Sequence, residues 1–280
     1  MKPQLRLAVE RACAEADRLT GGRVLAGYVV GSRADGSSVP SSDVDVLLVV
    51  SGAQDIDPRS LETATRHVPR LRTDFIVRSM AFYRRHGGPP LSETGLHVFG
   101  RDVTPEIPPE EFEPYFIRKV LGFVNYQRII RGTEGVLQYP VQPPSDARFS
   151  GYEVHGLLTG NGFCEGFRTL INLITQGSTV MVGVKTRSII HSKKQAVETY
   201  AALGDEPFVD LVQSAYYLLN QKLHYEIPAD ANDIVMAADI CTATPAFENH
   251  VLMAVRDQFE FWPSLDPDPL HRQMMATLHP

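Results

Sequence analysis

The sequence predicts an α+β protein: an N-terminal α/β domain with a small mixed sheet, followed by a C-terminal all-helical bundle domain. Short apolar runs rich in β-branched residues are confined to the first 100 residues. A stretch rich in proline and acidic residues follows at 101–114, and helical periodicity dominates beyond it. The 280 residues also suit two domains of ~150 residues each. We expect domains at 1–100 and 115–280, joined by a linker at 101–114.

The first domain is predicted to begin with a helix. Apolar residues recur at helical spacing over residues 4–19, and Gly21-Gly22 ends that run. Asp57-Pro58 indicates the start of another helix of roughly ten residues, because proline suits a first helical turn. Four apolar runs predict the strands of the sheet, namely Val24–Val30, Val44–Val50, Leu71–Val77 and Leu96–Phe99.

The second domain is predicted to be helical throughout. One apolar face recurs from Phe116 to Ile130, and a proline-rich loop is expected from Pro140 to Asp146. The remaining helices are expected at about 153–175, 191–203, 206–223 and 232–261.

Composition and charge narrow the class of partner. Lys and Arg number 27 against 33 Asp and Glu, so the net charge of −6 lacks the basic footprint of a nucleic-acid binder. A small cationic substrate suits such a chain. No apolar run approaches the ~18–20 residues of a membrane span, and the first residues lack the apolar region of a signal peptide. We expect a cytoplasmic protein that binds neither membrane nor nucleic acid.

The three cysteines are far apart in the sequence. Their number is odd, and no two of them form a Cys-x-x-Cys pair, which argues against a disulfide framework or a structural zinc site. The three residues are Cys13, Cys164 and Cys241. We expect buried free thiols.

The most informative segment lies between the first two predicted strands. The first strand ends at Gly31-Ser32, and the second carries Asp43 and Asp45. Side chains two residues apart on a strand share a face, so these two carboxylates project together. Gly31 permits close backbone approach, and the amide groups and hydroxyl that follow it can hold phosphate oxygens.

A third carboxylate belongs to the next predicted strand. Asp74 lies between Thr73 and Phe75, and it joins the other two if its strand lies beside theirs. Adjacent carboxylates repel unless a cation neutralises them, and hard oxygen ligands suit Mg²⁺. A charged side chain inside an otherwise buried strand is unfavourable unless a cation or another partner neutralises it. The combined pattern predicts a site for metal and nucleotide.

These motifs resemble a known signature. The segments GSRADG (31–36) and SDVDVLLVV (42–50) are similar to that of the DNA-polymerase-β-like nucleotidyltransferase superfamily, and most of all to its aminoglycoside adenylyltransferases, which modify streptomycin and spectinomycin. That family has a Gly-Ser-x-x-x-Gly turn, then Ser-Asp-x-Asp, and a helical domain follows. In the second domain, SKKQA (192–196) and SAY (214–216) resemble the family's lysine-containing helix start and its later Ala-Tyr.

The resemblance implies a reaction. A hydroxyl of a small molecule attacks the α-phosphorus of ATP, AMP is transferred and pyrophosphate leaves. Asp43 and Asp45 would ligate Mg²⁺, two ions in all, and Asp74 would act as general base, metal ligand or both. The nucleotide would be held in a cleft between the domains by Gly31, Ser32, Arg33, Ser42, Lys193 and Tyr216.

The acceptor is less defined than the reaction. An amino-sugar resembling an aminoglycoside is the first expectation. The antibiotic-modifying relatives, however, carry Glu where this chain has Asp74, and they hold the antibiotic with an acidic residue and a Trp. The single Trp of this chain, Trp262, is out of register. Adenylylation of another metabolite is therefore an alternative, as is a catalytically silent nucleotide-binding regulator on the same fold.

Overall fold

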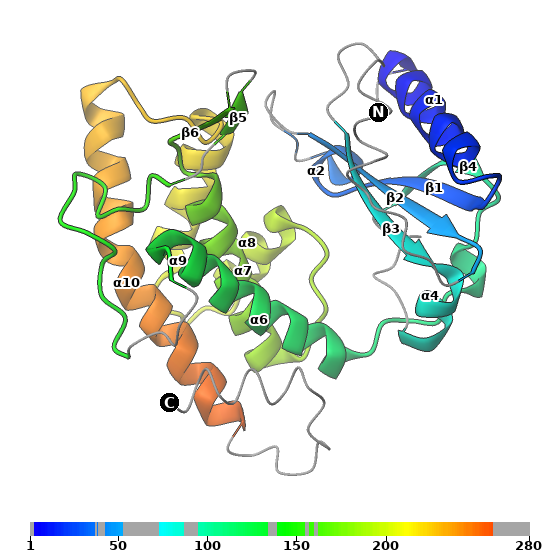
Figure 1. The fold of residues 1–280 in the computed structure, drawn as a ribbon. Helices are drawn as coiled ribbons and strands as arrows, with labels where there is room; N and C mark the ends of the chain where they lie inside the picture. The colour runs from blue at the N-terminus through cyan, green and yellow to red at the C-terminus, as the bar shows by residue number, and fades with distance from the viewer. Residues whose placement is uncertain are drawn as a thin grey trace. The chain divides into compact units, whose positions relative to one another are not determined.

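A computed structural model of the chain describes residues 3–36, 38, 43–52, 73–86, 95–133, 139–154, 157–159 and 162–259. The chain divides into two compact units, Met1–Glu111 and Phe112–Pro280. The first unit holds a small four-stranded mixed sheet and the second is mainly helical (Figure 1). The predicted α+β fold class is confirmed.

The first unit has its sheet in the order β3-β2-β1-β4. β2 and β3 are parallel, whereas β1 is antiparallel to both β2 and β4. The expected helix at Asp57-Pro58 lies outside the described residues. The elements of this unit are α1 (Pro3–Leu19), β1 (Val24–Val30), α2 (Ser32–Asp35), β2 (Val44–Val50), β3 (Thr73–Ser79), α4 (Met80–His86), β4 (Leu96–Gly100) and the 3-10 helix η1 (Thr104–Glu106).

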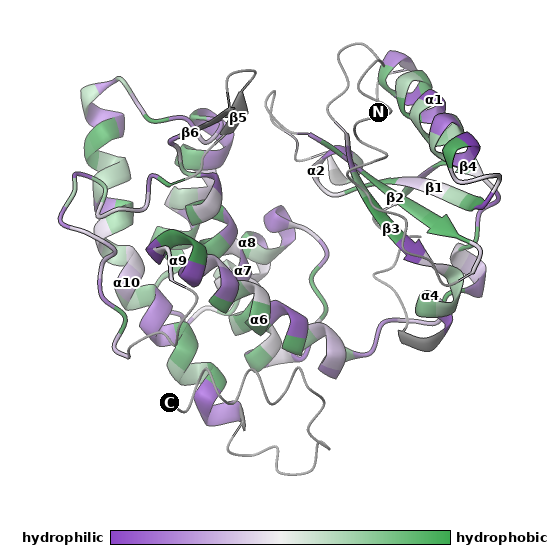
Figure 2. Cartoon of the chain, in the orientation of Figure 1, coloured by the Kyte–Doolittle hydropathy of each residue, from purple (hydrophilic) through white to green (hydrophobic). Residues whose placement is uncertain are grey.

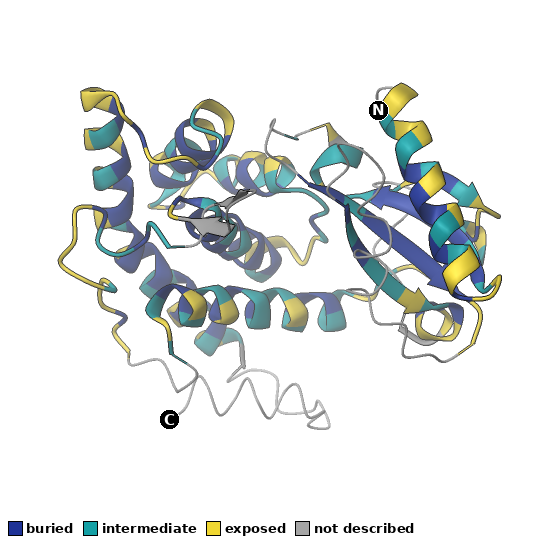
Figure 3. Cartoon of the chain, turned by 45° about the horizontal axis from the view of Figure 1, so that its top comes forward, coloured by how far each residue is buried: buried dark blue, intermediate teal, exposed yellow. Residues whose placement is uncertain are grey.

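Each face of this sheet has its own apolar cluster, because strand side chains alternate in direction. On β2, Val44, Val46, Leu48 and Val50 pack against buried residues of α1. Leu47 and Val49 belong to the cluster on the opposite face, with residues of α4. β2 is accordingly hydrophobic along most of its length, and α1 has one buried side and one exposed side (Figures 2 and 3).

α1 packs closely on the sheet at Cys13. A Cβ added to Gly27 of β1 would lie 2.9 Å from Cys13 Sγ, which is below any normal contact distance, so a larger residue there would displace Cys13. Cys13 is fully buried, and burial raises the pKa of its thiol to about 12. Cys13 and Cys241 are both buried free thiols, as predicted, whereas the Cys164 side chain is outside the described part of the chain.

A polar anchor joins the sheet to the residues after β4. The Tyr28 hydroxyl donates to Asp102 Oδ1 at 2.8 Å and accepts from the Val103 amide at 2.8 Å. Thr104 donates to the same Asp102 oxygen through its amide and its hydroxyl. These hydrogen bonds stabilise the carboxylate, and the pKa of Asp102 is lowered accordingly. Residues 102–104 of the expected linker thus belong to the packed first unit.

The second unit is built around α7, which contacts α6, α8, α10 and η2. None of the described helices is both long and apolar enough to cross a membrane. The elements of this unit are α6 (Phe112–Arg131), β5 (Leu157–Thr159), β6 (Gly162–Cys164), α7 (Arg168–Thr186), α8 (Lys193–Ala202), α9 (Val209–Ser214), the π-helix η2 (Ala215–Lys222) and α10 (Ala231–Phe259).

The prediction of a helix at about 153–175 is wrong for the first half of that range. β5 and β6 form an antiparallel hairpin there, and α7 begins only at Arg168 and continues to Thr186. The sequence between the two strands is Gly160-Asn161, followed by Gly162. Asn-Gly pairs favour tight hairpin turns, and glycine disfavours a helix interior, so this local chemistry outweighs the helical spacing of the apolar residues.

A buried carboxylate connects three segments of the second unit. The side chain of Glu248 on α10 is fully buried, and its Oε2 lies 3.0 Å from Arg131 Nη1. Gln127 Nε2 donates to Glu248 Oε2 at 2.7 Å, and the Tyr152 hydroxyl donates to Glu248 Oε1 at 2.6 Å. A buried charge is tolerated when it is paired and hydrogen-bonded in this way. The network therefore holds α6, α10 and the segment before β5 together.

Replacing Tyr152 by phenylalanine tests this network, because it removes the hydroxyl and keeps the ring. We expect the free energy of unfolding to fall by about 1.5–3 kcal/mol, the usual contribution of a hydrogen bond to a charged group. The matched control is Tyr139→Phe, since Tyr139 is 53% exposed, and it should change the value by less than ~0.5 kcal/mol. Urea denaturation measures both. Equal stability of the two variants would contradict the proposed role of Tyr152.

Candidate functional site

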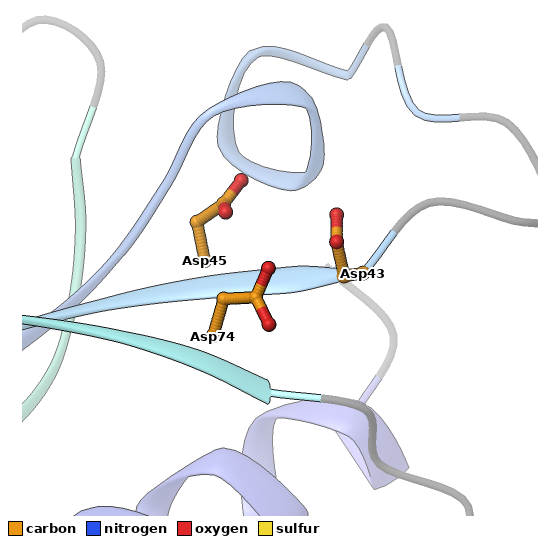
Figure 4. A group of neighbouring side chains, drawn as sticks. All are labelled: Asp43, Asp45 and Asp74. Carbon is orange, nitrogen blue, oxygen red and sulfur yellow. The ribbon is translucent and has the colours of Figure 1, made fainter. Parts of the chain in front are cut away.

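Three aspartates meet at one end of the sheet in the first unit. Asp43 directly precedes β2, Asp45 is the second residue of β2, and Asp74 is the second residue of β3. In the parallel pairing of the two strands, Asp45 stands opposite Asp74. One carboxylate oxygen from each residue lies within 4.8 Å of the others, and Figure 4 shows the three side chains gathered there.

The strand alternation explains why these carboxylates are on the same face. Val44 and Val46 pack in the cluster under α1, which directs Asp45 to the opposite face of β2. The same alternation on β3 buries Phe75 in that cluster and directs Asp74 away from it. Asp43 is 5% exposed, whereas Asp45 and Asp74 are half-buried.

Gly31 brings the end of β1 close to these carboxylates. Its neighbour Val30 pairs with Asp45 across the antiparallel ladder. Gly31 has φ 66° and ψ −152°, a conformation that is essentially restricted to glycine. A Cβ at this position would lie 2.6 Å from Asp45 Oδ2, so a larger residue would also displace the carboxylate. The glycine of the sequence motif is therefore required for two separate reasons.

The turn after Gly31 forms the short helix α2. The Ala34 amide donates to the Gly31 carbonyl at 2.9 Å, and Gly36 ends the helix with φ 80°. Ser32 is the first residue of this turn, and Arg33 Nη1 lies 3.5 Å from Ser38 Oγ. Ser42, the remaining phosphate ligand expected from the sequence, lies outside the described residues.

The donor atoms of the three aspartates suit a hard divalent cation. All are carboxylate oxygens, which Mg²⁺ and Ca²⁺ prefer over nitrogen or sulfur ligands. Two ligands on opposite sides of a single Mg²⁺ are about 4.2 Å apart, given Mg–O distances of ~2.0–2.1 Å. Adjacent ligands of such an ion are about 2.9 Å apart, so carboxylate oxygens separated by up to 4.8 Å would have to move closer together to bind a single ion. A pair of ions at ~3.5–4 Å is also compatible with this spacing.

The two site residues expected in the second unit have different surroundings. Lys193 is the first residue of α8 and is half-buried, with its Nζ 5.5 Å from the centre of the Tyr225 ring. Tyr216 belongs to the π-helix η2, is 3% exposed, and stacks edge-on against Tyr217 with 5.3 Å between the ring centres. Lys193 lines a cavity of the helical unit, whereas Tyr216 is not among the residues that line it.

This cavity has a volume of ≈ 190 Å³ and was not predicted from the sequence. One signal for it was present: polar residues recur at i, i+3, i+4 and i+7 on α7, which is otherwise mostly apolar and buried. α6 contributes Lys119 and Tyr126, α7 contributes Asn172, Thr175, Gln176 and Thr179, and the start of α8 contributes Ile190, His191, Ser192 and Lys193.

Comparison with known proteins shows a remote likeness at the level of structure. No family model and no curated protein matches the sequence. The fold is similar to the crystal structure of spectinomycin adenyltransferase AAD(9) from Enterococcus faecialis with ATP and spectinomycin. The sequence identity is 12%, the TM-score is 0.49, and the match covers 85% of this chain and 98% of the other. A likeness of this degree carries no inference about activity.

Proposed function

We propose that this protein is a Mg²⁺-dependent nucleotidyltransferase, which transfers AMP from ATP to a hydroxyl group of a small molecule and releases pyrophosphate. The observation that carries the proposal is the group formed by Asp43, Asp45 and Asp74. Three carboxylates at the start of two paired strands, beside a turn that only glycine can form, suit the binding of divalent cations and a nucleoside triphosphate.

Each aspartate has a proposed role. Asp43 and Asp45 bind Mg²⁺, which when present stabilises the negative charge of the attacking and leaving oxygens. Asp74 accepts the proton of the acceptor hydroxyl, binds the metal, or does both. The small size of Gly31 lets the backbone approach the phosphates, and Ser32, Arg33 and Ser42 hold them. The sequence patterns around Lys193 and Tyr216 support a contact of each with the nucleotide.

The acceptor is proposed as a hydroxylated small molecule, with an amino-sugar as the first expectation. Adenylylation of another metabolite remains the main alternative. Mass spectrometry can decide between them: the protein is incubated with Mg²⁺, each nucleoside triphosphate in turn, and a panel of aminoglycosides and metabolites. A nucleotidyl adduct formed by the wild type and not by an Asp43→Asn, Asp45→Asn double variant supports the proposal. If nucleotide binds and no acceptor is ever modified, a silent regulator is favoured.

The first prediction for the proposed function concerns metal binding. The Asp43→Asn, Asp45→Asn double variant should lose Mn²⁺ binding, used as a probe for Mg²⁺, because it removes two of the three charged ligands. The control Glu15→Gln removes a carboxylate that pairs with Arg18 on α1, outside the group of aspartates. Electron paramagnetic resonance of added Mn²⁺ measures both. Binding of Mn²⁺ by the double variant at wild-type affinity would rule out the two-aspartate metal site.

The second prediction concerns Asp74. Asp74→Asn keeps the side-chain shape and cannot accept a proton, so turnover should fall by about 10²–10⁴-fold, the usual contribution of general-base catalysis. A metal-ligand role would add a higher Mg²⁺ requirement, which titration of Mg²⁺ against initial rate detects. Asp74→Glu should also be slow, because small displacements of a catalytic group are costly. An unchanged rate for Asp74→Asn would remove Asp74 from the mechanism.

The third prediction concerns Gly31. Gly31→Ala should lower the free energy of unfolding by about 1–3 kcal/mol through backbone strain, and it should weaken Mn²⁺ binding because the new Cβ displaces the Asp45 carboxylate. The control is Gly52→Ala, since Gly52 also has a positive φ of 86° and its Cβ would meet no atom within 4 Å. We expect that control to lose stability and keep Mn²⁺ binding. Equal Mn²⁺ affinities in the two variants would count against the close approach of Gly31 to the metal ligands.

A further inference from the structure

Two consecutive residues after the π-helix η2 have a left-handed backbone. The φ angles of His224 and Tyr225 are 50° and 72°. Glycine usually takes this conformation where a helix ends, whereas a bulky aromatic residue in it is a clear outlier. Strained backbone of this kind persists only when the surrounding structure holds it, and it is concentrated at functional sites. The conformation of Tyr225 therefore calls for a physical reason.

Hydrogen bonds fix the backbone of Tyr225 on both sides. Its amide donates to the Leu219 carbonyl of η2 at 2.8 Å, and its carbonyl accepts from the Phe167 amide, just before α7, also at 2.8 Å. The side chain is buried, with 7% of its surface exposed. Glycine would allow the same two backbone hydrogen bonds without strain. The presence of a tyrosine at this position thus points to a use for its ring.

The ring of Tyr225 lies against the ammonium group of Lys193. Lys193 Nζ is over the face of the ring, 5.5 Å from its centre, which is within the ~6 Å of a cation–π contact. A lysine side chain is long and samples many rotamers, and ordering such a side chain when a ligand binds costs free energy. A lysine that the protein already holds in place avoids part of that cost.

The backbone that leads to Lys193 is fixed by other residues. The Tyr115 hydroxyl donates to the Ile190 carbonyl at 3.0 Å and accepts from the Ile190 amide at 2.8 Å, so one buried hydroxyl pairs both polar groups of that residue. Ser192 Oγ then caps the first turn of α8. Tyr225 therefore acts on the side chain of Lys193 and not on the path of its backbone.

We propose that Tyr225 is a positioning residue, which holds the ammonium group of Lys193 in the orientation that the nucleotide requires. This role rests on the contact between Lys193 and the nucleotide that is part of the proposed function. Tyr225 lies outside the sequence patterns at 192–196 and 214–216, and only the structure brings its ring to Lys193. The strained backbone is the means by which the chain delivers an aromatic face to that lysine.

A first measurement detects the contact itself in the full-length protein without nucleotide. The six lysines of the sequence are converted to ¹³C-dimethyl-lysine, which keeps their charge, and their methyl signals are recorded by NMR. We expect the ring of Tyr225 to shift the Lys193 signal upfield in the wild type and in Tyr225→Phe, and not in Tyr225→Leu. Lys194 is the control, because it is 60% exposed and pairs with Glu198 at 3.7 Å. A Lys193 signal that Tyr225→Leu leaves unchanged would overturn the proposal.

A double-mutant cycle then tests the positioning role. Isothermal titration calorimetry gives the affinity for ATP of the wild type, Tyr225→Leu, Lys193→Met and the two changes together. We expect Tyr225→Leu alone to weaken ATP binding by about 2- to 10-fold, the cost of ordering one long side chain, and Tyr225→Phe to keep the wild-type affinity. In the Lys193→Met background, Tyr225→Leu should cause no further loss, because no ammonium group is left to position. Additive losses would show that the ring acts through the fold and would overturn the role.

The matched control for the loss of a buried ring is Tyr83→Leu. Tyr83 is 3% exposed and belongs to an apolar cluster of the first unit. We expect this control to lose stability and keep the wild-type affinity for ATP, and an equal loss of affinity in Tyr83→Leu and Tyr225→Leu would contradict the positioning role. If Lys193→Met leaves ATP affinity unchanged, Lys193 does not contact the nucleotide and the role of Tyr225 is overturned with it. The proposed reaction is judged separately, by Mn²⁺ binding and turnover in the aspartate variants.

Discussion

The parallel pairing of β2 with β3 is the constraint on which the candidate site depends. Asp45 stands opposite Asp74 only in the observed register, and a slip of one residue would turn Asp74 to the face that packs against α1. The apolar alternation of both strands opposes such a slip, because it would bury a carboxylate and expose Phe75. Packing of the core therefore fixes the geometry of the acidic group. The apolar alternation that determines how the sheet of the first unit packs also determines the arrangement of the candidate site.

The sequence predicted this part of the molecule well for a physical reason. The period of two in the Val/Leu run of β2 determines which side chains share a face, so the common direction of Asp43 and Asp45 follows from local sequence alone. The position of Asp74 depended on the condition that its strand lies beside theirs, and the pairing of β2 and β3 meets that condition. The ψ value of Gly31, and the lack of room for a Cβ between Gly31 and Asp45, could not be predicted, because they depend on the pairing of β1 with β2.

The features that the sequence did not predict involve local turns or distant segments. The β5–β6 hairpin interrupts a run of apolar residues that also fits a helix, and the Gly-Asn-Gly sequence was the evidence against that helix. The cavity of the helical unit combines Lys119 with residues of α7 and α8 that are more than 50 positions away, and helical periodicity does not show which helices pack together. Glu248 and Lys119 illustrate the contrast: the first is surrounded by donors, whereas the second has no described carboxylate beside it.

The tight packing of Cys13 beneath the sheet has a consequence for studying motion in the first unit. Only a thiolate reacts rapidly with alkylating reagents, and in the folded state the Cys13 thiol is buried and stays protonated at neutral pH. It becomes reactive when α1 separates from β1. The rate of its alkylation, located by peptide mapping, therefore measures how often this helix opens, and comparing that rate with global unfolding tells whether α1 detaches by itself.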